Sequence, residues 1–117
     1  MNKKQTGNFA EFMARVYLRL KGYHILEKDY ITGRGTTAGE IDIIALKKNV
    51  LVFVEVKNRK TLENAFYAIK PQQQKRILNA AKFYLAKHPL YEKHDVRFDA
   101  IFVSGFKLRH ILNAWGA

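Results

Sequence analysis

Two apolar stretches, Gly39-Glu-Ile-Asp-Ile-Ile-Ala-Leu46 and Val50-Leu-Val-Phe-Val-Glu-Val-Lys57, decide the fold of this chain. Both are rich in β-branched residues, and the polar segment 47–49 separates them, which predicts an antiparallel hairpin. Side chains alternate between the faces of a strand, so each stretch should carry its charges on a single face. The predicted charged face of the first stretch holds Glu40, Asp42, Ile44 and Leu46, opposite Ile41, Ile43 and Ala45. That of the second holds Leu51, Phe53, Glu55 and Lys57.

The carboxylates of Asp42 and Glu55 therefore lie inside apolar strands. An ionised carboxylate in such surroundings costs on the order of several kcal/mol unless a cation or hydrogen bonds compensate it. A hairpin can bring both carboxylates to one side of the sheet, with Lys57 one pleat from Glu55. We therefore expect a neutralising partner for both acids.

Two helices are predicted, one before and one after the hairpin. Residues 7–21 carry apolar side chains at three- and four-residue spacing, and Gly22 suits the position after a helix end. Residues 71–87 start with a proline, which the first helical turn tolerates, and Pro89 should stop the helix. The predicted buried stripe of the first helix is Phe9, Phe12, Met13, Val16, Tyr17 and Leu20. That of the second is Ile77, Leu78, Ala81, Tyr84 and Leu85.

Further strands are predicted at residues 23–30 and 96–104. Residues 107–115 should add an edge strand or a short terminal element, whereas 58–69 give no clear prediction. The order of helix, three strands, helix, and one or two strands is typical of an α/β fold with a mixed sheet between helices. A chain of 117 residues suits one domain, spanning 1–117.

The composition predicts a folded, basic protein. Twenty-one lysines and arginines face ten acids, giving a formal charge of +11, and 48% of the residues are hydrophobic. Such a charge favours a polyanionic partner, of which nucleic acid is the most common, with an anionic membrane surface as the competing interpretation. No segment resembles a membrane span or a signal peptide, so we expect a cytoplasmic protein. The absence of cysteine excludes disulfides and thiolate zinc sites.

Asp42, Glu55 and Lys57 together favour a metal-dependent chemistry. Carboxylate oxygens are the ligands that Mg²⁺ and Mn²⁺ prefer, and a bound divalent ion activates water and stabilises charge on a phosphodiester. A neighbouring lysine can position that water. The alternative is a salt bridge of Lys57 with Glu55 or Asp42 and no metal, which the Glu-Val-Lys tripeptide alone favours. Glu11, on the first helix, is either the partner of Arg15 in a surface pair or a third acid of the site.

The linear pattern of several motifs resembles the YraN-like family. The motifs are Ala10-Glu11, Gly22-Tyr23, Gly39-Glu-Ile-Asp42, Val52-Phe-Val-Glu-Val-Lys57 with Arg59, Arg97-Phe-Asp99 and His110-Ile-Leu-Asn-Ala114. The resemblance implies a restriction-endonuclease-like fold with a PD-(D/E)xK core, in the order αβββαβ(β), related in outline to archaeal Holliday junction resolvases. It implies that Asp42 and Glu55 are metal ligands, that Lys57 positions water, and that Glu11 is an additional catalytic acid.

This chain departs from the family pattern at two places. Ala10 stands where the family usually has glycine, and Asp29 with a longer loop to Ala38 replaces a shorter, asparagine-containing link. The different loop bears on which DNA shape fits the site. The role of Glu40, within the motif, stays open.

The leading hypothesis is thus a Mg²⁺- or Mn²⁺-dependent nuclease acting on structured or branched DNA. The alternative is a nucleic-acid-binding or partner-binding module that keeps the fold without turnover. Symmetric cutting of a junction would call for a homodimer. The residues predicted to contact nucleic acid are Arg34 in the glycine-rich loop, Arg59 and Lys60 after the second hairpin strand, and Lys75 on the second helix.

Overall fold

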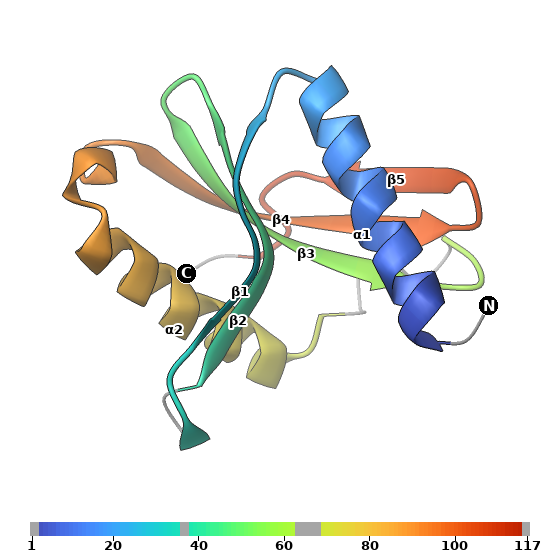
Figure 1. The fold of residues 1–117 in the computed structure, drawn as a ribbon, viewed down its shortest axis with the longest axis horizontal. Coiled ribbons are helices and arrows are strands. Elements are labelled where there is room, and N and C mark those ends of the chain that lie inside the picture. The colour runs from blue at the N-terminus through green and yellow to red at the C-terminus, as the bar shows by residue number, and fades with distance from the viewer. Residues whose placement is uncertain (1–2, 36–37, 63–68, 116–117) are drawn as a thin grey trace.

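The computed structural model describes residues 3–35, 38–62 and 69–115, and side chains within its first helix from residue 7 onward (Figure 1). Its elements are α1 (Lys3–Leu20), β1 (His24–Thr32), β2 (Gly39–Lys47), β3 (Val50–Asn58), α2 (Pro71–Lys87), the short 3-10 helix η3 (Pro89–Tyr91), β4 (Asp95–Ser104) and β5 (Lys107–Ile111). The predicted α/β class is confirmed. The order differs from the predicted one because η3 separates α2 from β4, whereas the two strands that follow lie within the predicted one or two.

The five strands form one mixed sheet in the order β1-β2-β3-β4-β5. The pairs β1–β2, β2–β3 and β4–β5 are antiparallel, whereas β3 and β4 are parallel. The predicted hairpin is confirmed as β2–β3, and Lys48 in its turn has a positive φ of 53°. The parallel pair needs a long crossover, which contains α2.

The two helices pack on opposite faces of this sheet. One core cluster joins α1 to Ile43, Val52 and Ile101, and the other joins α2 to Ile44 and Phe53. The second helix buries Ile77, Ala80, Ala81 and Tyr84, close to its predicted stripe. Across the described parts of the chain, no helix is both long and apolar enough to cross a bilayer.

The prediction for α1 selected the wrong face. The helix buries Ala10, Ala14 and Leu18, which recur every four residues, whereas Phe12, Val16 and Leu20 of the predicted stripe are exposed. Met13 and Tyr17 pack against the core from its flank. Two alanines at the contact let the helix backbone lie close to the sheet, so side-chain size determines which face is buried.

The predicted alternation within β2 also fails at one point. Ile43 packs on the α1 side, but Ile41, two residues earlier, packs with the α2 cluster. Two residues of a regular strand at that spacing would share a face, so the strand changes its pleat at Asp42. The pairing of β2 with β3 runs from Lys47 opposite Val50 to Ile43 opposite Val54, and stops at the same place.

The start of β2 lies directly against α2. A Cβ atom on Gly39 would stand 2.6 Å from the backbone nitrogen of Ala80 and 2.7 Å from the carbonyl oxygen of Arg76. Only glycine fits this close approach of strand and helix. The contact fixes β2, the strand that carries Asp42, against α2, which lies on the face of the sheet opposite α1.

Candidate active site

Asp42 lies where β2 departs from β3. Its Oδ2 accepts a hydrogen bond from the backbone N–H of Val56 at 2.7 Å. The backbone pairing of β2 with β3 ends at Ile43 and Val54. Beyond this pair, the side-chain hydrogen bond of Asp42 links the two strands in place of a backbone hydrogen bond. The irregular pleat of β2 therefore fixes the Asp42 carboxylate between the two strands of the hairpin.

Two further acids reach Asp42 from other elements. In the β1–β2 pair, Lys28 lies opposite Ile43 and Tyr30 opposite Ile41, so Asp29 and Asp42 are the residues between these pairs. Glu11 reaches them from α1, and carboxylate oxygens of Glu11, Asp29 and Asp42 lie within 4.8 Å of one another. The helix thus supplies a third acid, as predicted for Glu11.

Glu55 and Lys57 complete the group from β3. Glu55 is only 7% exposed and forms a hydrogen bond with the Asp42 carboxyl group. Lys57 Nζ lies 4.0 Å from Glu55 Oε1, at the long limit of an ion pair. The structure therefore brings together all four predicted catalytic residues. Asp42 lies between Glu11 on α1 and the pair Glu55 and Lys57 on β3.

Negative charge is poorly compensated in this group. Burial, followed by the hydrogen bond and the charge of Asp42, raises the pKa of Glu55 to about 9, although Lys57 opposes the shift. Burial, the hydrogen bond with Asp29 and the charge of Asp42 raise the pKa of Glu11 to about 8, against the effect of Arg15. Without a further cation, both carboxyl groups therefore hold protons at neutral pH.

The donor set suits a hard divalent cation. Carboxylate oxygens from Asp42 and Glu55 match the ligands of Mg²⁺ and Mn²⁺, and Glu11 and Asp29 offer further oxygens to the ion or to its waters. Such a cation would lower the cost of ionising these groups, which one lysine at 4.0 Å does not remove. The site has the residue types that a metal-assisted hydrolysis requires.

The other predicted residues lie outside this group. Glu40 is exposed and pairs with Arg76 of α2 at 3.4 Å. Arg34, in the loop before β2, and Lys75, on α2, are exposed. Arg59 donates to the neighbouring carbonyl oxygen of Asn58, and its backbone N–H donates to Val103.

Asp29 was not among the predicted catalytic residues. It has a positive φ of 51°, a conformation that aspartate and asparagine tolerate better than most residues. The signal available in the sequence was its position before Tyr30 at the end of a predicted strand, where an acid is otherwise uncommon. Its proximity to Asp42 follows from the β1–β2 register, which the sequence pattern did not determine.

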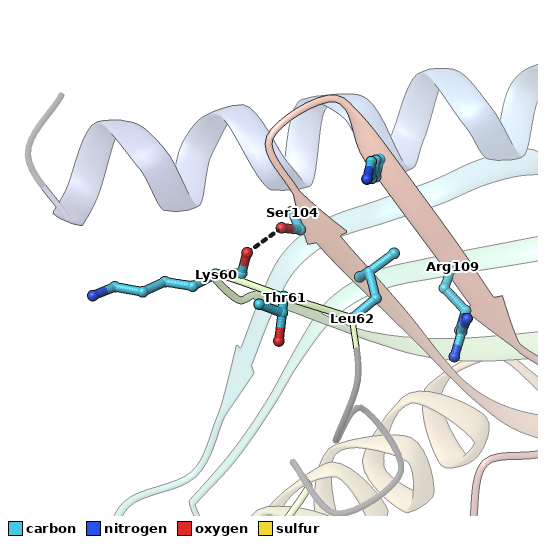
Figure 2. A pocket seen from close by; sticks show the side chains of 6 residues that line it. Lys60, Thr61, Leu62, Ser104 and Arg109 are labelled. Carbon is cyan, nitrogen blue, oxygen red and sulfur yellow. Dashed lines mark hydrogen bonds between the residues drawn. The ribbon is translucent and has the colours of Figure 1, made fainter.

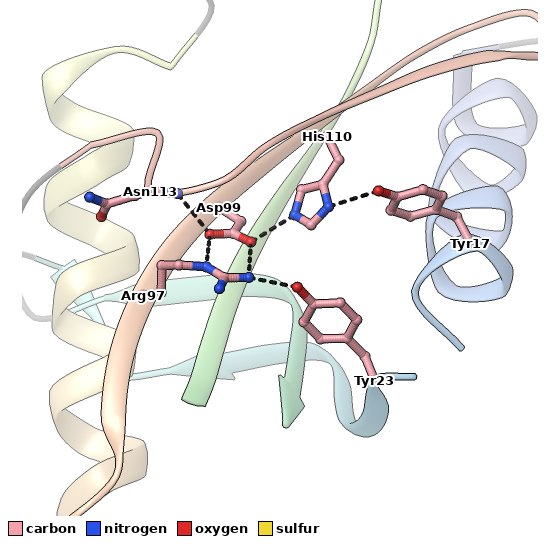
Figure 3. Close-up of polar contacts among 6 residues, drawn as sticks. All are labelled: Tyr17, Tyr23, Arg97, Asp99, His110 and Asn113. Atoms are coloured by element: carbon pink, nitrogen blue, oxygen red, sulfur yellow. Dashed lines mark hydrogen bonds and ion pairs between the residues drawn. The ribbon is translucent and has the colours of Figure 1, made fainter. Parts of the chain in front are cut away.

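A second polar cluster surrounds the fully buried Asp99 on β4 (Figure 3). Arg97 donates to both carboxylate oxygens at 2.8 Å, the backbone N–H of Asn113 donates to Oδ1, and His110 Nε2 lies 2.7 Å from Oδ2. Arg97 also donates to the hydroxyl of Tyr23. His110 Nδ1 is 3.0 Å from the Tyr17 hydroxyl. The cluster joins α1, the start of β1, β4 and β5.

The family model described as Uncharacterised protein family UPF0102 matches residues 10–103. The chain belongs to this family. It is 46% identical over 114 residues to a UPF0102 protein of Bradyrhizobium diazoefficiens. The alignment covers 97% of this chain and 83% of the relative. It is also 44% identical over 113 residues to a UPF0102 protein of Paramagnetospirillum magneticum. This alignment covers 96% of this chain and 88% of the relative. The predicted family is thereby confirmed, and the matched region includes Glu11, Asp29, Asp42, Glu55 and Lys57.

Proposed function

We propose that this chain is a metal-dependent nuclease of the restriction-endonuclease-like class, which hydrolyses phosphodiester bonds of structured or branched DNA. The observation that carries the proposal is the convergence of four carboxyl groups and Lys57 at the irregular point of β2, with two of the acids at raised pKa. Raised carboxyl pKa values gather at functional sites because catalytic groups need pKa values matched to their task. The resemblance of the hairpin motifs to the PD-(D/E)xK pattern supports the same conclusion.

Each residue then has a distinct role. Asp42 and Glu55 would hold Mg²⁺ or Mn²⁺, which when bound would supply an activated water and a positive charge to stabilise the phosphate. Lys57, beside Glu55, orients the attacking water and offsets charge on the phosphate oxygens. Glu11 and Asp29, whose carboxylate oxygens lie within 4.8 Å of that of Asp42, would accept hydrogen bonds from waters of the ion on the α1 side. The formal charge of +11 favours binding of the polyanionic substrate.

A cleavage panel tests this function. Duplex, single-stranded, flap and four-way DNA, with single-stranded RNA for comparison, are incubated with the purified protein and Mg²⁺ or Mn²⁺. We expect cleavage of at least one branched substrate, its loss in EDTA, and a fall of at least about 100-fold for Asp42→Asn and for Lys57→Ala. The exposed acid Glu92, changed to glutamine, is the matched control. Equal cutting by Asp42→Asn would refute the assignment.

A binding module without turnover is the second candidate. It is favoured by the Lys57–Glu55 contact, which partly compensates the charge of Glu55 without any metal. Such a module would bind DNA with strong salt dependence, and Asp42→Asn would leave the affinity unchanged or improve it because a negative charge is lost. Calorimetric titration with Mn²⁺ separates the candidates, since the module has no reason to bind the ion at Asp42.

A further inference from the structure

A hollow of about 590 Å³ opens beside the end of the β4–β5 hairpin (Figure 2). We call it the β5 hollow. Its lining comes from the segment after β3 and from the two strands of the hairpin: Lys60, Thr61, Leu62, Ser104, Lys107 and Arg109. The Ser104 hydroxyl donates to the carbonyl oxygen of Lys60 at 2.7 Å and so attaches the segment after β3 to the end of β4.

Among the described residues, the charges that line the β5 hollow are all positive. Of the six lining residues that the structure describes, three are cationic and none is acidic. Lys107 and Arg109 are exposed, and within the described parts of the chain neither makes an ion pair. Uncompensated cations in a concave surface attract anions more strongly than the same charges spread over a convex one.

The sheet register places this hollow next to the candidate active site. Lys57 on β3 lies opposite Phe102 on β4, and Phe102 lies opposite Arg109 on β5. Residues paired in this way point to the same face, so Arg109 shares the face of Lys57, two strands away. At about 4.8 Å between neighbouring strands, their Cα atoms are separated by about 10 Å.

We propose that the β5 hollow binds a backbone phosphate of the nucleic-acid strand that occupies the site at Asp42 and Glu55. This inference rests on the proposed function and adds a substrate subsite to it. Lys57 and Arg109 are therefore close enough to contact neighbouring phosphates of one strand, because successive phosphates of a strand lie farther apart than the axial rise of about 3.4 Å per nucleotide. Arg109 offers a planar pair of donors to phosphate oxygens, and Lys107 and the Thr61 hydroxyl offer further donors.

Binding without cleavage provides the first test. A fluorescent four-way junction is titrated in EDTA, at several salt concentrations, with the parent protein and with Lys107→Ala/Arg109→Ala. We expect about tenfold weaker binding for the double variant at 0.1 M salt. The slope of log affinity against log salt should fall by about one, because one phosphate contact is lost. The control, Lys82→Ala/Lys93→Ala, removes the same charge from exposed positions elsewhere and should weaken binding less than about twofold. Equal weakening by both double variants would overturn the proposal.

Neutral phosphates provide the second test. A single methylphosphonate is moved along one strand of the junction, and affinity is measured for the parent and for the Lys107→Ala/Arg109→Ala variant. We expect one position at which neutralisation weakens binding by the parent and not by the variant, because only the parent retains the contact. That position should lie within about two nucleotides of the cleaved bond. No such position would refute the subsite.

The two failures are distinguishable. If the parent cuts DNA and both tests fail, the nuclease function stands and the β5 hollow has no role in binding. If no substrate is cut but both binding tests succeed, the hollow is a phosphate subsite of a binding module and the proposed catalysis is wrong. Unfolding curves of both double variants should match that of the parent, since all four changed side chains are exposed.

Discussion

Glu55 and Asp99 are buried carboxyl groups on neighbouring parallel strands, yet their surroundings are opposite. Burial alone would raise both pKa values. Hydrogen bonds from His110, Arg97 and the backbone of Asn113 outweigh burial and lower the pKa of Asp99. Glu55 instead faces Asp42, and its pKa is raised to about 9.

The difference shows which of the two regions is a candidate for chemistry. Asp99 has a donor for every strong acceptor position, and hydrogen bonding to Asp99 in turn raises the pKa of Arg97. Such a network stabilises the fold and has no capacity left for a ligand. The group around Asp42 combines several acids with one lysine at 4.0 Å. Burial of a carboxylate is therefore informative only together with the number of its donors.

The largest expected effect is on stability, from Asp99→Asn. The variant removes the counter-charge of Arg97, leaves its partly buried guanidinium without a counterion and takes an acceptor from His110, so the free energy of unfolding should fall by about 3 kcal/mol. Urea unfolding at pH 7 measures it. Asp95→Asn, exposed at the start of the same strand, should change stability by less than about 0.5 kcal/mol. A loss below about 1 kcal/mol for Asp99→Asn would contradict the structural role of this network.

Addition of Mn²⁺ should raise the free energy of unfolding through the region around Asp42 alone and not through the Asp99 network. An ion that binds the folded protein and not the unfolded chain adds about 2.7 kcal/mol to the free energy of unfolding at a concentration of one hundred times its Kd. We expect this gain with Mn²⁺ for the parent and for Asp99→Asn, and none for Asp42→Asn. Calorimetry gives the Kd and urea unfolding gives the gain. An equal gain in the free energy of unfolding for Asp42→Asn would show that the ion binds at a site other than Asp42.

The pH dependence of stability should separate the two regions by sign. In the metal-free protein, the unfolded chain releases the Glu55 proton near pH 4.5, while the folded protein keeps it until about pH 9. Stability should therefore fall as the pH rises between these values. Asp99 acts in the opposite direction, because its lowered pKa contributes stability that is lost as the pH falls below its ordinary value of 3.8.

Glu55→Gln tests this sign directly. Glutamine keeps the size of the side chain and cannot ionise, so at pH 8 in EDTA the variant should be more stable than the parent by roughly 2 kcal/mol. Its stability should also vary less between pH 5 and about pH 9. Urea unfolding across this range measures both effects. An unchanged pH profile would show that Glu55 is compensated by Lys57, as the salt-bridge interpretation requires.

Sequence patterns predicted the hairpin and its acids because these are local features. Glu55 and Lys57 are two residues apart on one strand, and Asp42 lies on the strand that a two-residue turn joins to it. Asp29 depends instead on the register of β1 against β2, and the pleat change at Asp42 depends on packing against both helices. Neither is encoded in a short pattern.

The wrong face predicted for α1 and the network at Asp99 that was not predicted have different causes. Hydrophobicity favoured Phe12 and Leu20 over Ala10 and Ala14, but a helix lying close to a sheet selects small side chains. The Asp99 network brings together side chains as far apart in sequence as Tyr17 and His110. Arg97-Phe-Asp99 was recognised only as part of a family pattern, and its partners follow from the completed sheet.

The smallest expected effect concerns the outer end of the Asp99 network. His110 Nε2 faces a carboxylate, which can only accept, so this nitrogen carries the proton and the Nδ1 of a neutral ring accepts from the Tyr17 hydroxyl. Tyr17→Phe removes one half-buried hydrogen bond and should cost about 1 kcal/mol in urea unfolding, less than Asp99→Asn because Asp99 keeps all its donors. The Mn²⁺ affinity should stay that of the parent. A loss as large as that of Asp99→Asn would mean that the histidine, and with it the pairing of β5 to the rest of the sheet, depends on α1 for its orientation.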